Sequence, residues 1–412
     1  MVTKIRKCRN CGSEKIYEFL YLGSMPLPNG FIPEEKLAGK EAKYELAAGV
    51  CRNCSLMQLT DVVDPKIMFK NYVYIPSTSN TRLANFRGIV EELIKLNSPE
   101  PHSLAVDIGS NDGSLLLEFK KRGVATLGID PAENLSKVAE LKGIRTVNAY
   151  FSKTLAEKLI KTEGRAHYIT ATNVIAHIDN LHDFFTGISI LLRKDGLLLC
   201  EFPYVVDLLQ KNLFDTVYQE HLSYFSVKPL IQVLHKHDLK ICDIRRTTID
   251  GGALRLIISG KEAVFSENSA EINKLLNLEK RLGLDRLDVY KNFGKKVRNL
   301  KKEIIRTLKQ LKKKGKTIAG YGAAARGNIL MNYCNIGRNE LEFIVDSTPY
   351  KQGLYTPGTK IRIYPEEEML RRKPDYVLIL AWNFAEEIIA KQKKYQSKGG
   401  KFIIPVPYVQ VI

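Results

Sequence analysis

The sequence has no hydrophobic run long enough to cross a membrane. Its longest apolar stretches, at residues 188–200 and 376–382, are interrupted by charge or shorter than the about 20 residues that a membrane-spanning helix needs. The N-terminus also lacks the charged and apolar segments of a secretory signal. Internal repeats and low-complexity segments are missing as well. We therefore expect a soluble cytoplasmic protein with no membrane partner.

Acidic residues are scarce relative to basic ones, with 45 Asp and Glu against 63 Lys and Arg. A nucleic-acid-binding protein would use such an excess to neutralise phosphates. Much of it, however, lies between residues 291 and 316, where lysines and arginines share a helical pattern with an apolar stripe. That pattern is typical of a solvated helix face. We expect no nucleic-acid partner, and an anionic small substrate carrying a diphosphate is an equally good account of the charge.

Cysteines are few, but four of the seven form two matched pairs, Cys8 with Cys11 and Cys51 with Cys54. Each Cys-x-x-Cys turn directs two thiolates the same way, so the pairs together can bind one Zn²⁺ tetrahedrally. Four sulfur ligands leave no open coordination position, and such a zinc stabilises structure without taking part in chemistry. The alternatives are a redox dithiol and incidental cysteines, which two matched pairs disfavour.

The 412 residues are too many for one ordinary core and predict two or three domains. We expect a zinc-binding module at 1–75. An α/β domain at 76–262 follows, because strand and helix patterns alternate there as in a parallel sheet with helices on both faces. The charged, helix-forming stretch 263–315 is predicted to be a helical connector. A second, Rossmann-like α/β domain is expected at 316–412.

A glycine-containing loop follows the first predicted strand of the central domain. Asp107-x-Gly109-x-x-x-Gly113 lets the backbone approach a ligand closely, and Asp130, about 20 residues on, lies where an acid pairs with ribose hydroxyls. Asn111 replaces the middle glycine of a dinucleotide loop, which favours the S-adenosylmethionine loop of class I methyltransferases. An NAD loop and a purely structural turn are the alternatives. The predicted cofactor contacts are Asp107, Gly109, Asn111, Asp112, Gly113, Asp130 and Asn173.

The densest group of chemically active side chains is at 214–225. Within it, Tyr218, Glu220, His221 and Tyr224 supply a base, a carboxylate and two phenols, which are the groups needed to remove a proton next to a carbonyl. Histidine titrates near neutral pH, and a phenol can donate to a developing enolate oxygen. A loop with buried aromatics and a structural histidine is an equally good interpretation of this cluster alone.

Two further segments are candidates for the same site. Asn173 and His177 follow a predicted strand end, where open α/β sheets bind ligands, although a helix cap and a core histidine would look the same. Tyr72, Tyr74 and Ser77 follow the zinc module and place two phenols and a hydroxyl within reach of the sheet. Ordinary packing explains one of the two tyrosines equally well.

These motifs occur in one order along nearly the whole chain. The additional motifs are Cys54-x-Leu-x-Gln-Leu59, Gly128-Ile-Asp-Pro131, Gly251-Gly-x-Leu-Arg255, Tyr321-Gly-Ala-x-Ala-x-Gly327 and Val345-Asp-x-x-Pro-x-Lys351. Together with the cysteine pairs and the 218–224 cluster, they resemble the zinc-containing nucleotide-sugar C-methyltransferases that make branched deoxysugars. This combination is far more specific than any single motif.

The resemblance implies a zinc module, an S-adenosylmethionine domain and a C-terminal domain that helps to hold a nucleoside-diphosphate 4-keto-deoxyhexose. In that family pattern His221 removes the proton beside the ketone, and Glu220, Tyr218, His177 and Tyr72 shape the enolate site. The carbanion then attacks the methyl group. The implied substrate contacts are Tyr74, Ser77, Tyr224, Arg255, Arg326 and Lys351, the last two with the diphosphate. A monomer or weak homo-oligomer is expected.

The sequence departs from the family pattern at two positions. Gln219 stands where the family usually has His, so one proton-transfer group is an amide, and Ala253 replaces a common Ser. Methyl transfer to oxygen or nitrogen of a related nucleotide sugar is therefore an alternative. A zinc-ribbon RNA-binding protein and a noncatalytic sugar-nucleotide sensor are alternatives from other classes. The C-terminal loop at Gly320 and Gly322 lacks the Gly-x-Gly-x-x-Gly spacing, which favours a sugar-nucleotide surface or a scaffold turn over an NAD site.

Overall fold

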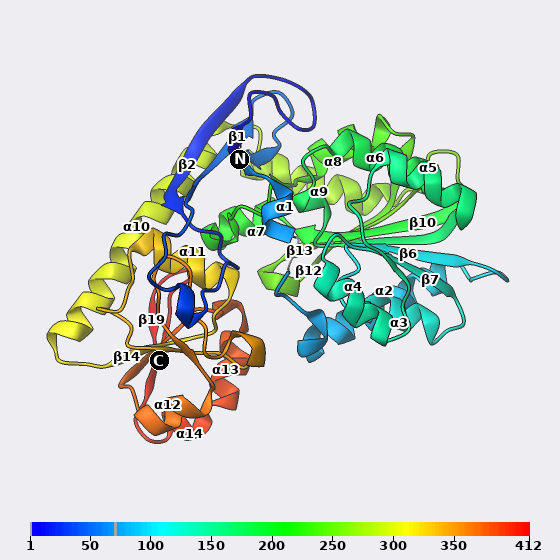
Figure 1. The fold of residues 1–412 in the computed structure, drawn as a ribbon. Helices are drawn as coiled ribbons and strands as arrows, with labels where there is room; N and C mark the ends of the chain where they lie inside the picture. The colour runs from blue at the N-terminus through cyan, green and yellow to red at the C-terminus, as the bar shows by residue number, and fades with distance from the viewer. Residues whose placement is uncertain (1, 70–71) are drawn as a thin grey trace.

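A computed structural model describes residues 2–69 and 72–412. Figure 1 shows two α/β lobes, with the N-terminal module above and between them and one long helix running along the C-terminal lobe. Within the described ranges, no helix has the length and apolar character needed to span a bilayer.

The N-terminal module is a small antiparallel sheet whose fourth strand comes from the central domain. The strand order is β11-β4-β3-β2, and β1 pairs separately with β5. The elements of the module are β1 (Val2–Lys4), β2 (Ile16–Met25), η1 (Glu34–Lys36), β3 (Tyr44–Cys51), β4 (Met57–Leu59), β5 (Asp61–Val63), α1 (Pro65–Phe69) and η2 (Pro76–Thr78). Strand β11 (Ser223–Tyr224) ends the loop that carries the predicted catalytic cluster.

The central domain has a seven-stranded sheet in the order β12-β13-β10-β9-β6-β7-β8. Its elements are α2 (Asn80–Leu96), β6 (Leu104–Ile108), α3 (Ser114–Lys120), β7 (Ala125–Ile129), α4 (Glu133–Leu141), β8 (Thr146–Val147), α5 (Lys153–Thr162), β9 (Ala166–Thr172), η3 (Ile175–His177), α6 (Leu181–Leu191), β10 (Leu192–Pro203), α7 (Val205–Gln210), η4 (Phe214–Thr216), α8 (Val227–His235), β12 (Leu239–Thr247), η5 (Ile249–Gly251) and β13 (Ala253–Gly260). Helices α2, α3 and α4 lie on one face, and α5, α6 and α8 lie on the other (Figure 1).

The central sheet is not wholly parallel, which corrects the sequence-based expectation. β13 pairs antiparallel with both β10 and β12, whereas β10, β9, β6, β7 and β8 are parallel. The connection from β12 to β13 is too short for a helical crossover, so the chain can only return as a hairpin. The parallel strands still direct their carboxyl ends to one edge, which is where ligands of such sheets bind.

The C-terminal domain has a six-stranded sheet in the order β16-β15-β14-β17-β18-β19, parallel except for β19. Its elements are β14 (Ile318–Tyr321), α11 (Ala325–Cys334), β15 (Ile344–Val345), η6 (Pro349–Lys351), β16 (Ile363–Tyr364), α12 (Glu367–Arg372), β17 (Tyr376–Ile379), η7 (Trp382–Phe384), α13 (Ala385–Lys391), α14 (Lys393–Gln396), β18 (Lys401–Ile404) and β19 (Gln410–Val411).

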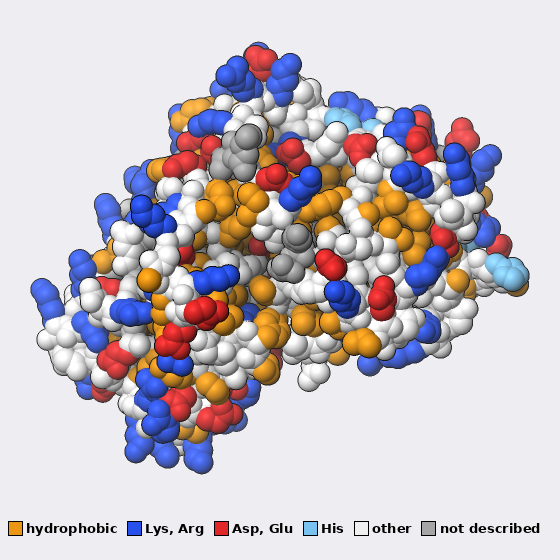
Figure 2. All heavy atoms as spheres, viewed as in Figure 1, with side chains coloured by type: hydrophobic (Ala, Val, Ile, Leu, Met, Phe, Trp, Pro, Cys, Tyr) orange, Lys and Arg blue, Asp and Glu red, His pale blue; other side chains and the backbone are white. Residues whose placement is uncertain are grey.

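Helices α9 (Ser269–Leu282) and α10 (Leu287–Lys313) join the two lobes and pack against other elements. The ring of Tyr290 on α10 lies 5.1 Å from the ring of Phe19 on β2, and Glu279 on α9 accepts a hydrogen bond from Tyr204. Figure 2 shows Lys and Arg side chains gathered along the left margin and foot of this face, over α10 and the C-terminal domain. The basic side of α10 therefore faces solvent, and its apolar side supports the zinc module.

Candidate active site

The loop between β6 and α3 forms the floor of a cavity of about 410 Å³. Gly109 has φ of +70°, and a Cβ at this position would lie 2.5 Å from Cγ2 of Val174. Only glycine meets both the conformation and the close contact, so the loop keeps its backbone open to a ligand. Asn111 is also left-handed, with φ of +51°, and its side-chain amide donates to the carbonyl of Tyr74. This bond holds the backbone of Tyr74 against the loop.

Five of the seven predicted cofactor residues line this cavity: Asp107, Gly109, Asn111, Asp130 and Asn173. Burial raises the pKa of Asp107 to about 7, although the hydroxyl of Thr170 donates to its carboxylate. Burial also raises the pKa of Asp130. The two carboxylate oxygens of Asp130 accept the N–H groups of Asn111 and Ala132, both at 2.8 Å, which fixes this carboxylate at the end of β7.

The other two predicted cofactor residues lie behind the loop. Asp112 is fully buried, accepts the N–H of Ser114 and forms an ion pair with Lys142 at 2.6 Å. A Cβ on Gly113 would lie 3.1 Å from Ile144, so this glycine allows α3 to pack closely. Neither residue is among those that line the cavity. Their direct contact with a cofactor therefore stays a prediction, and the geometry gives them a supporting role.

The donor set and the size of the cavity fit S-adenosylmethionine. About 410 Å³ lies within the usual range for a small-ligand pocket. Its wall contains Ser110, whose buried hydroxyl has no hydrogen-bond partner among residues 2–69 and 72–412. A buried polar atom without a partner is costly unless a ligand or water satisfies it. Asn173, His177 and α1 of the zinc module also contribute to the wall.

His221 is buried in a cluster beside this cavity. Its Nδ1 is 2.9 Å from the carbonyl oxygen of Thr216, and its Nε2 is 2.8 Å from the hydroxyl of Tyr218. Because a carbonyl only accepts hydrogen bonds, Nδ1 must carry the proton, and Nε2 accepts from Tyr218. Burial lowers the pKa of His221 well below 6.5. The imidazole is therefore neutral near pH 7, with its basic nitrogen toward Tyr218.

His177 connects this cluster to the cavity that it lines. Its ring stacks on His221 with centroids 5.1 Å apart and on Phe69 of α1 with centroids 5.5 Å apart. Burial lowers the pKa of His177 to about 4, and within the described residues its Nε2 has no partner. Phe69 was not predicted, although an aromatic residue shortly before Tyr72 is the signal that would have suggested it.

Glu220 receives hydrogen bonds from two segments far from it in sequence. Asn29 donates to Oε1 at 2.7 Å, and the hydroxyl of Tyr72 donates to Oε2 at 2.8 Å. Burial raises the pKa of Glu220, and these two bonds oppose that rise. Burial and the nearby Glu220 charge raise the pKa values of Tyr72 and Tyr218, which therefore stay protonated. Asn29 was missed because Pro-Asn-Gly is the sequence of an ordinary turn.

The predicted substrate residues are dispersed over several places. Tyr74 lines the cavity, whereas Ser77 is exposed and lies outside the cavity wall. Tyr224 is buried, and its hydroxyl donates to the carbonyl of Thr216 at 3.3 Å. Tyr224 thus supports the backbone group that orients His221. A substrate contact for Ser77 or Tyr224 stays a prediction that the geometry does not favour.

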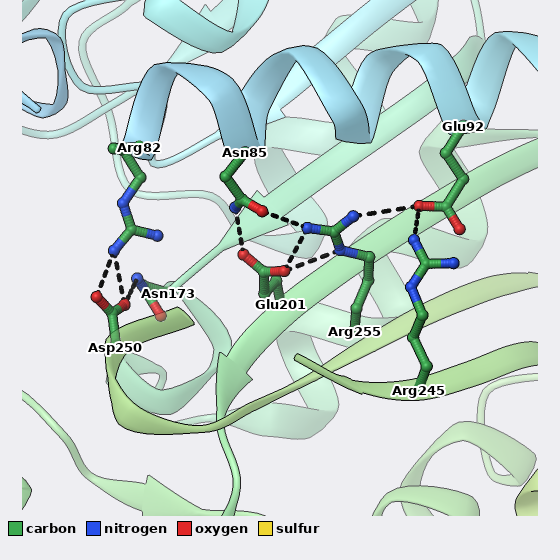
Figure 3. Close-up of polar contacts among 8 residues, drawn as sticks. All are labelled: Arg82, Asn85, Glu92, Asn173, Glu201, Arg245, Asp250 and Arg255. Carbon is green, nitrogen blue, oxygen red and sulfur yellow. Dashed lines mark hydrogen bonds and ion pairs between the residues drawn. The ribbon is translucent and has the colours of Figure 1, made fainter. Parts of the chain in front are cut away.

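Arg255 is part of a buried ionic network between α2 and the sheet (Figure 3). Its guanidinium lies 2.7 Å from the carboxylate of Glu201 and 3.2 Å from that of Glu92, and it also donates to Asn85. Arg245 forms an ion pair with the same Glu92. With its donors directed to these partners, Arg255 secures α2 to β10 and β13, and its predicted substrate contact is not supported by this placement.

A second ion pair in Figure 3 borders the cavity. Arg82 donates to both carboxylate oxygens of Asp250, at 2.6 and 2.7 Å, and the amide of Asn173 donates to the same carboxylate. The carbonyl of Asp250 accepts a hydrogen bond from Arg326 of the C-terminal domain at 2.9 Å. Asp250 therefore links the cavity wall to the second lobe, which sequence patterns did not suggest.

Arg326 and Lys351 lie around the glycine-containing loop between β14 and α11. Arg326 is the second residue of α11 and stacks over Trp382 at 5.2 Å. Lys351 donates to the carbonyl of Ala323 in the loop at 3.1 Å. Two cations thus lie beside the N-terminus of α11, a position that favours phosphate groups, although Lys351 also lies 3.8 Å from the carboxylate of Asp346.

The four predicted zinc ligands come together. The sulfurs of Cys8 and Cys54 are 3.5 Å apart, as are those of Cys11 and Cys51, and all four atoms lie within 4.8 Å of one another. Sulfurs at 2.3 Å from one tetrahedral Zn²⁺ lie about 3.8 Å apart, so the arrangement fits the metal. A second group, Glu100, His167 and Asp195, is already filled by a cation, because Nη2 of Arg193 lies 2.8 Å from both acids.

The zinc module holds the loop at 214–225 in place. Ser223 and Tyr224 pair antiparallel with Gln58 and Met57, and the N–H of Leu59 donates to the carbonyl of Leu222 at 3.0 Å. Arg9, between the first two cysteines, donates to Asp179 of the cavity wall at 2.8 Å. The metal site is therefore a structural support for the loop of His221 as well as for its own module.

Three family models match successive parts of the chain. They are described as "Putative zinc binding domain" for residues 8–69, "Methyltransferase domain" for 83–244 and "C-methyltransferase C-terminal domain" for 248–407. The chain is 34% identical to C-methyltransferase NovU from Streptomyces niveus over 412 residues, covering 100% of this chain and 98% of that protein.

Solved methyltransferase structures are similar to part of the chain. Magnesium protoporphyrin IX methyltransferase from Synechocystis, with bound S-adenosylmethionine, matches 47% of this chain and 86% of its own, at 14% identity and a TM-score of 0.34. The plantazolicin methyltransferase BpumL matches 44% of this chain and 84% of its own, at 12% identity and a TM-score of 0.35.

The chain is similar to a C-methyltransferase over its full length. Its cavity fits S-adenosylmethionine, and four of its cysteines lie close enough together to bind one zinc ion. The chain belongs to the C-methyltransferase family, as an S-adenosylmethionine-dependent, zinc-binding methyltransferase.

Proposed function

We propose that this enzyme methylates a carbon atom next to the keto group of a nucleoside-diphosphate 4-keto-deoxysugar. The observation that carries the proposal is the stacking of neutral His221 on His177, which itself lines the cofactor cavity. A base so placed can remove a proton from a carbon that lies beside the methyl donor. Bound S-adenosylmethionine supplies a methyl group activated by a sulfonium charge.

His221 is the proposed base because its Nε2 carries the lone pair. In the structure this nitrogen accepts the hydroxyl of Tyr218, so Tyr218 must release it when a substrate C–H approaches. The freed hydroxyl can then donate to the oxygen of the developing enolate. One exchange of partners thus prepares both the base and the oxyanion donor.

The reaction needs no reactant other than the sugar and the methyl donor. The proton passes from the substrate carbon to Nε2 of His221, and the electron pair of the C–H bond forms the enolate. S-adenosylmethionine held by the loop of Gly109 and by Asp130 would supply the methyl group to this carbon, with S-adenosylhomocysteine as the leaving group. Tyr218 and Tyr72, whose pKa values are raised, remain hydrogen-bond donors throughout.

The nucleotide end of the substrate is assigned to the C-terminal domain. Arg326 and Lys351 beside the N-terminus of α11 offer two cations for the diphosphate. Arg326 also bonds to the carbonyl of Asp250, next to the cavity wall. A diphosphate held there would direct the sugar toward His221.

The test is solvent-deuterium exchange followed by product analysis. Each candidate nucleoside-diphosphate 4-keto-deoxysugar is incubated with the enzyme in D₂O, with and without S-adenosylmethionine, and examined by NMR. We expect exchange at the carbon next to the ketone without the methyl donor, and a new carbon-bound methyl group with it. Methyl on oxygen or nitrogen, or no exchange with any such sugar, would reject the proposal.

A further inference from the structure

The carboxylate of Glu220 is almost fully enclosed, with only 2% of the residue exposed. Among residues 2–69 and 72–412, its hydrogen-bond donors are the amide of Asn29 at 2.7 Å and the hydroxyl of Tyr72 at 2.8 Å. Each oxygen therefore receives one donor. Both donors come from the first quarter of the chain and not from the catalytic loop itself.

The position of Asn29 is set by the C-terminal domain. Asn29 lies in a tight turn in which the N–H of Gly30 donates to the carbonyl of Leu27. The neighbouring carbonyl of Pro28 accepts the amide of Asn328 on α11 at 2.6 Å, and Asn328 is completely buried. Ile32 forms an antiparallel bridge with Tyr355, with hydrogen bonds of 2.8 and 2.9 Å. The turn is thus attached to the domain assigned to the nucleotide.

We propose that Asn29 is a positioning residue that holds Glu220 in its ionised form and in one orientation, and so links the C-terminal domain to the reaction centre. The inference rests on the proposed function for what Glu220 does during the reaction. The contact itself, and its effect on the ionisation of Glu220, do not depend on the identity of the substrate.

The chemistry of the amide gives the direction of this effect. An N–H donor stabilises a carboxylate more than a carboxylic acid, so the bond from Asn29 lowers the pKa of Glu220 against the rise caused by burial. The titratable groups facing Glu220 are Tyr72 and Tyr218, with His221 next in sequence. An ionised Glu220 keeps both phenols protonated, which preserves Tyr218 as a donor to the enolate oxygen.

The first experiment measures Glu220 directly and needs no substrate. Protein labelled with ¹³C at the glutamate carboxyls is titrated by NMR, with Glu220→Gln used to assign the signal. In Asn29→Ala we expect the pKa of Glu220 to rise by about one pH unit, as expected for loss of a hydrogen bond to a charged group. An unchanged pKa would overturn the proposal.

The second experiment follows the pH dependence of exchange and methyl transfer. The acidic limb of the rate profile should move upward in Asn29→Ala by the same amount as the pKa of Glu220, with the rate recovering at higher pH. Asn29→Gln, which keeps the amide, should restore part of the shift. An equal loss of rate at every pH would mean that Asn29 has a merely structural role.

Two further variants separate an effect on the charge of Glu220 from a general loss of structure. Asn29→Asp has nearly the same size and places a second carboxyl against Glu220, so the pair should share a proton and the limb should move further than in Asn29→Ala. Asn268→Ala is the matched control, because Asn268 also donates to a carboxylate, that of Asp243, but on the exposed surface. It should leave the profile unchanged.

The two proposals can fail separately. A raised pKa of Glu220 in Asn29→Ala, together with no exchange in the wild type, would reject the proposed function and leave the role of Asn29 standing.

Discussion

The hydroxyl of Tyr218 lies 2.8 Å from Nε2 of His221, so the proposed base and the proposed oxyanion donor are hydrogen-bonded to each other before substrate arrives. Tyr218→Phe should leave His221 as a base but remove the donor. We expect the exchange rate to fall about 100-fold to 1,000-fold, as on loss of one oxyanion-hole donor. His221→Ala should abolish exchange while S-adenosylmethionine binding, measured by calorimetry, survives.

Tyr224→Phe provides the matched control for that experiment. Its ring lies 6.2 Å from the ring of His221, and its hydroxyl donates to a backbone carbonyl. Because its bond to the carbonyl of Thr216 is long, at 3.3 Å, losing it should change the orientation of His221 little, and we expect an exchange rate within a few-fold of wild type. Equal losses in Tyr218→Phe and Tyr224→Phe would show that the phenols only support the loop.

The glycine at position 109 should be needed for cofactor binding. Gly109→Ala combines a positive φ with a Cβ placed 2.5 Å from Val174, which strains the loop by about 1 to 3 kcal/mol. If this strain opposes binding in full, S-adenosylmethionine should bind about 5-fold to 150-fold more weakly, and calorimetric titration measures this. Unaltered affinity would mean that the loop does not contact the cofactor.

The enclosed histidines make the fold sensitive to acid. The pKa of His177 is lowered from 6.5 to about 4, so between these values the unfolded chain binds a proton that the folded chain does not. The contribution of His177 to the free energy of unfolding is therefore fully present above pH 6.5. It decreases as the pH falls, by about 2 kcal/mol at pH 5. His177→Gln should lessen the difference in unfolding free energy between pH 7 and pH 5, measured by urea denaturation. An unchanged difference would contradict the lowered pKa.

Loss of zinc should affect the reaction as well as the N-terminal module. Cys51→Ser removes one of four thiolates and should release the metal, which metal analysis of the purified protein measures. Because β4 pairs with β11, the loop that carries the proposed base His221 should loosen too, and exchange should fall together with the zinc content. Cys242→Ser is the control, since that sulfur donates to Ser259 on the central sheet, outside the zinc module. Normal kinetics in a zinc-free protein would reject this coupling.

Local patterns were enough to predict the features whose residues are close in sequence. Two cysteine pairs predicted a closed metal site, and all four sulfurs come together in the fold. The motif around Gly109 predicted a ligand-binding loop, and a cavity lies at that loop, because a strand, a glycine turn and a helix form a local unit. The antiparallel β13 was missed, since strand and helix alternation indicates parallel pairing until a short hairpin interrupts it.

Features that depend on distant contacts could not be predicted in this way. Asn29 reaches Glu220 across 191 positions, and no motif near Pro28 or Gly30 distinguishes it from a surface turn. Arg255 belongs to a family motif and was predicted to bind substrate, yet its guanidinium is placed on Glu201 and Glu92. Motifs locate candidate positions, while burial and charge pairing decide what each side chain does there.

The fourth strand of the small N-terminal sheet consists of residues 223–224, which belong to the central domain. A chimera that transplants the first 75 residues from a relative would therefore disturb the register of the loop that carries His221. Exchanging the substrate preference of two relatives calls for moving that strand and its neighbours together with the metal-binding part.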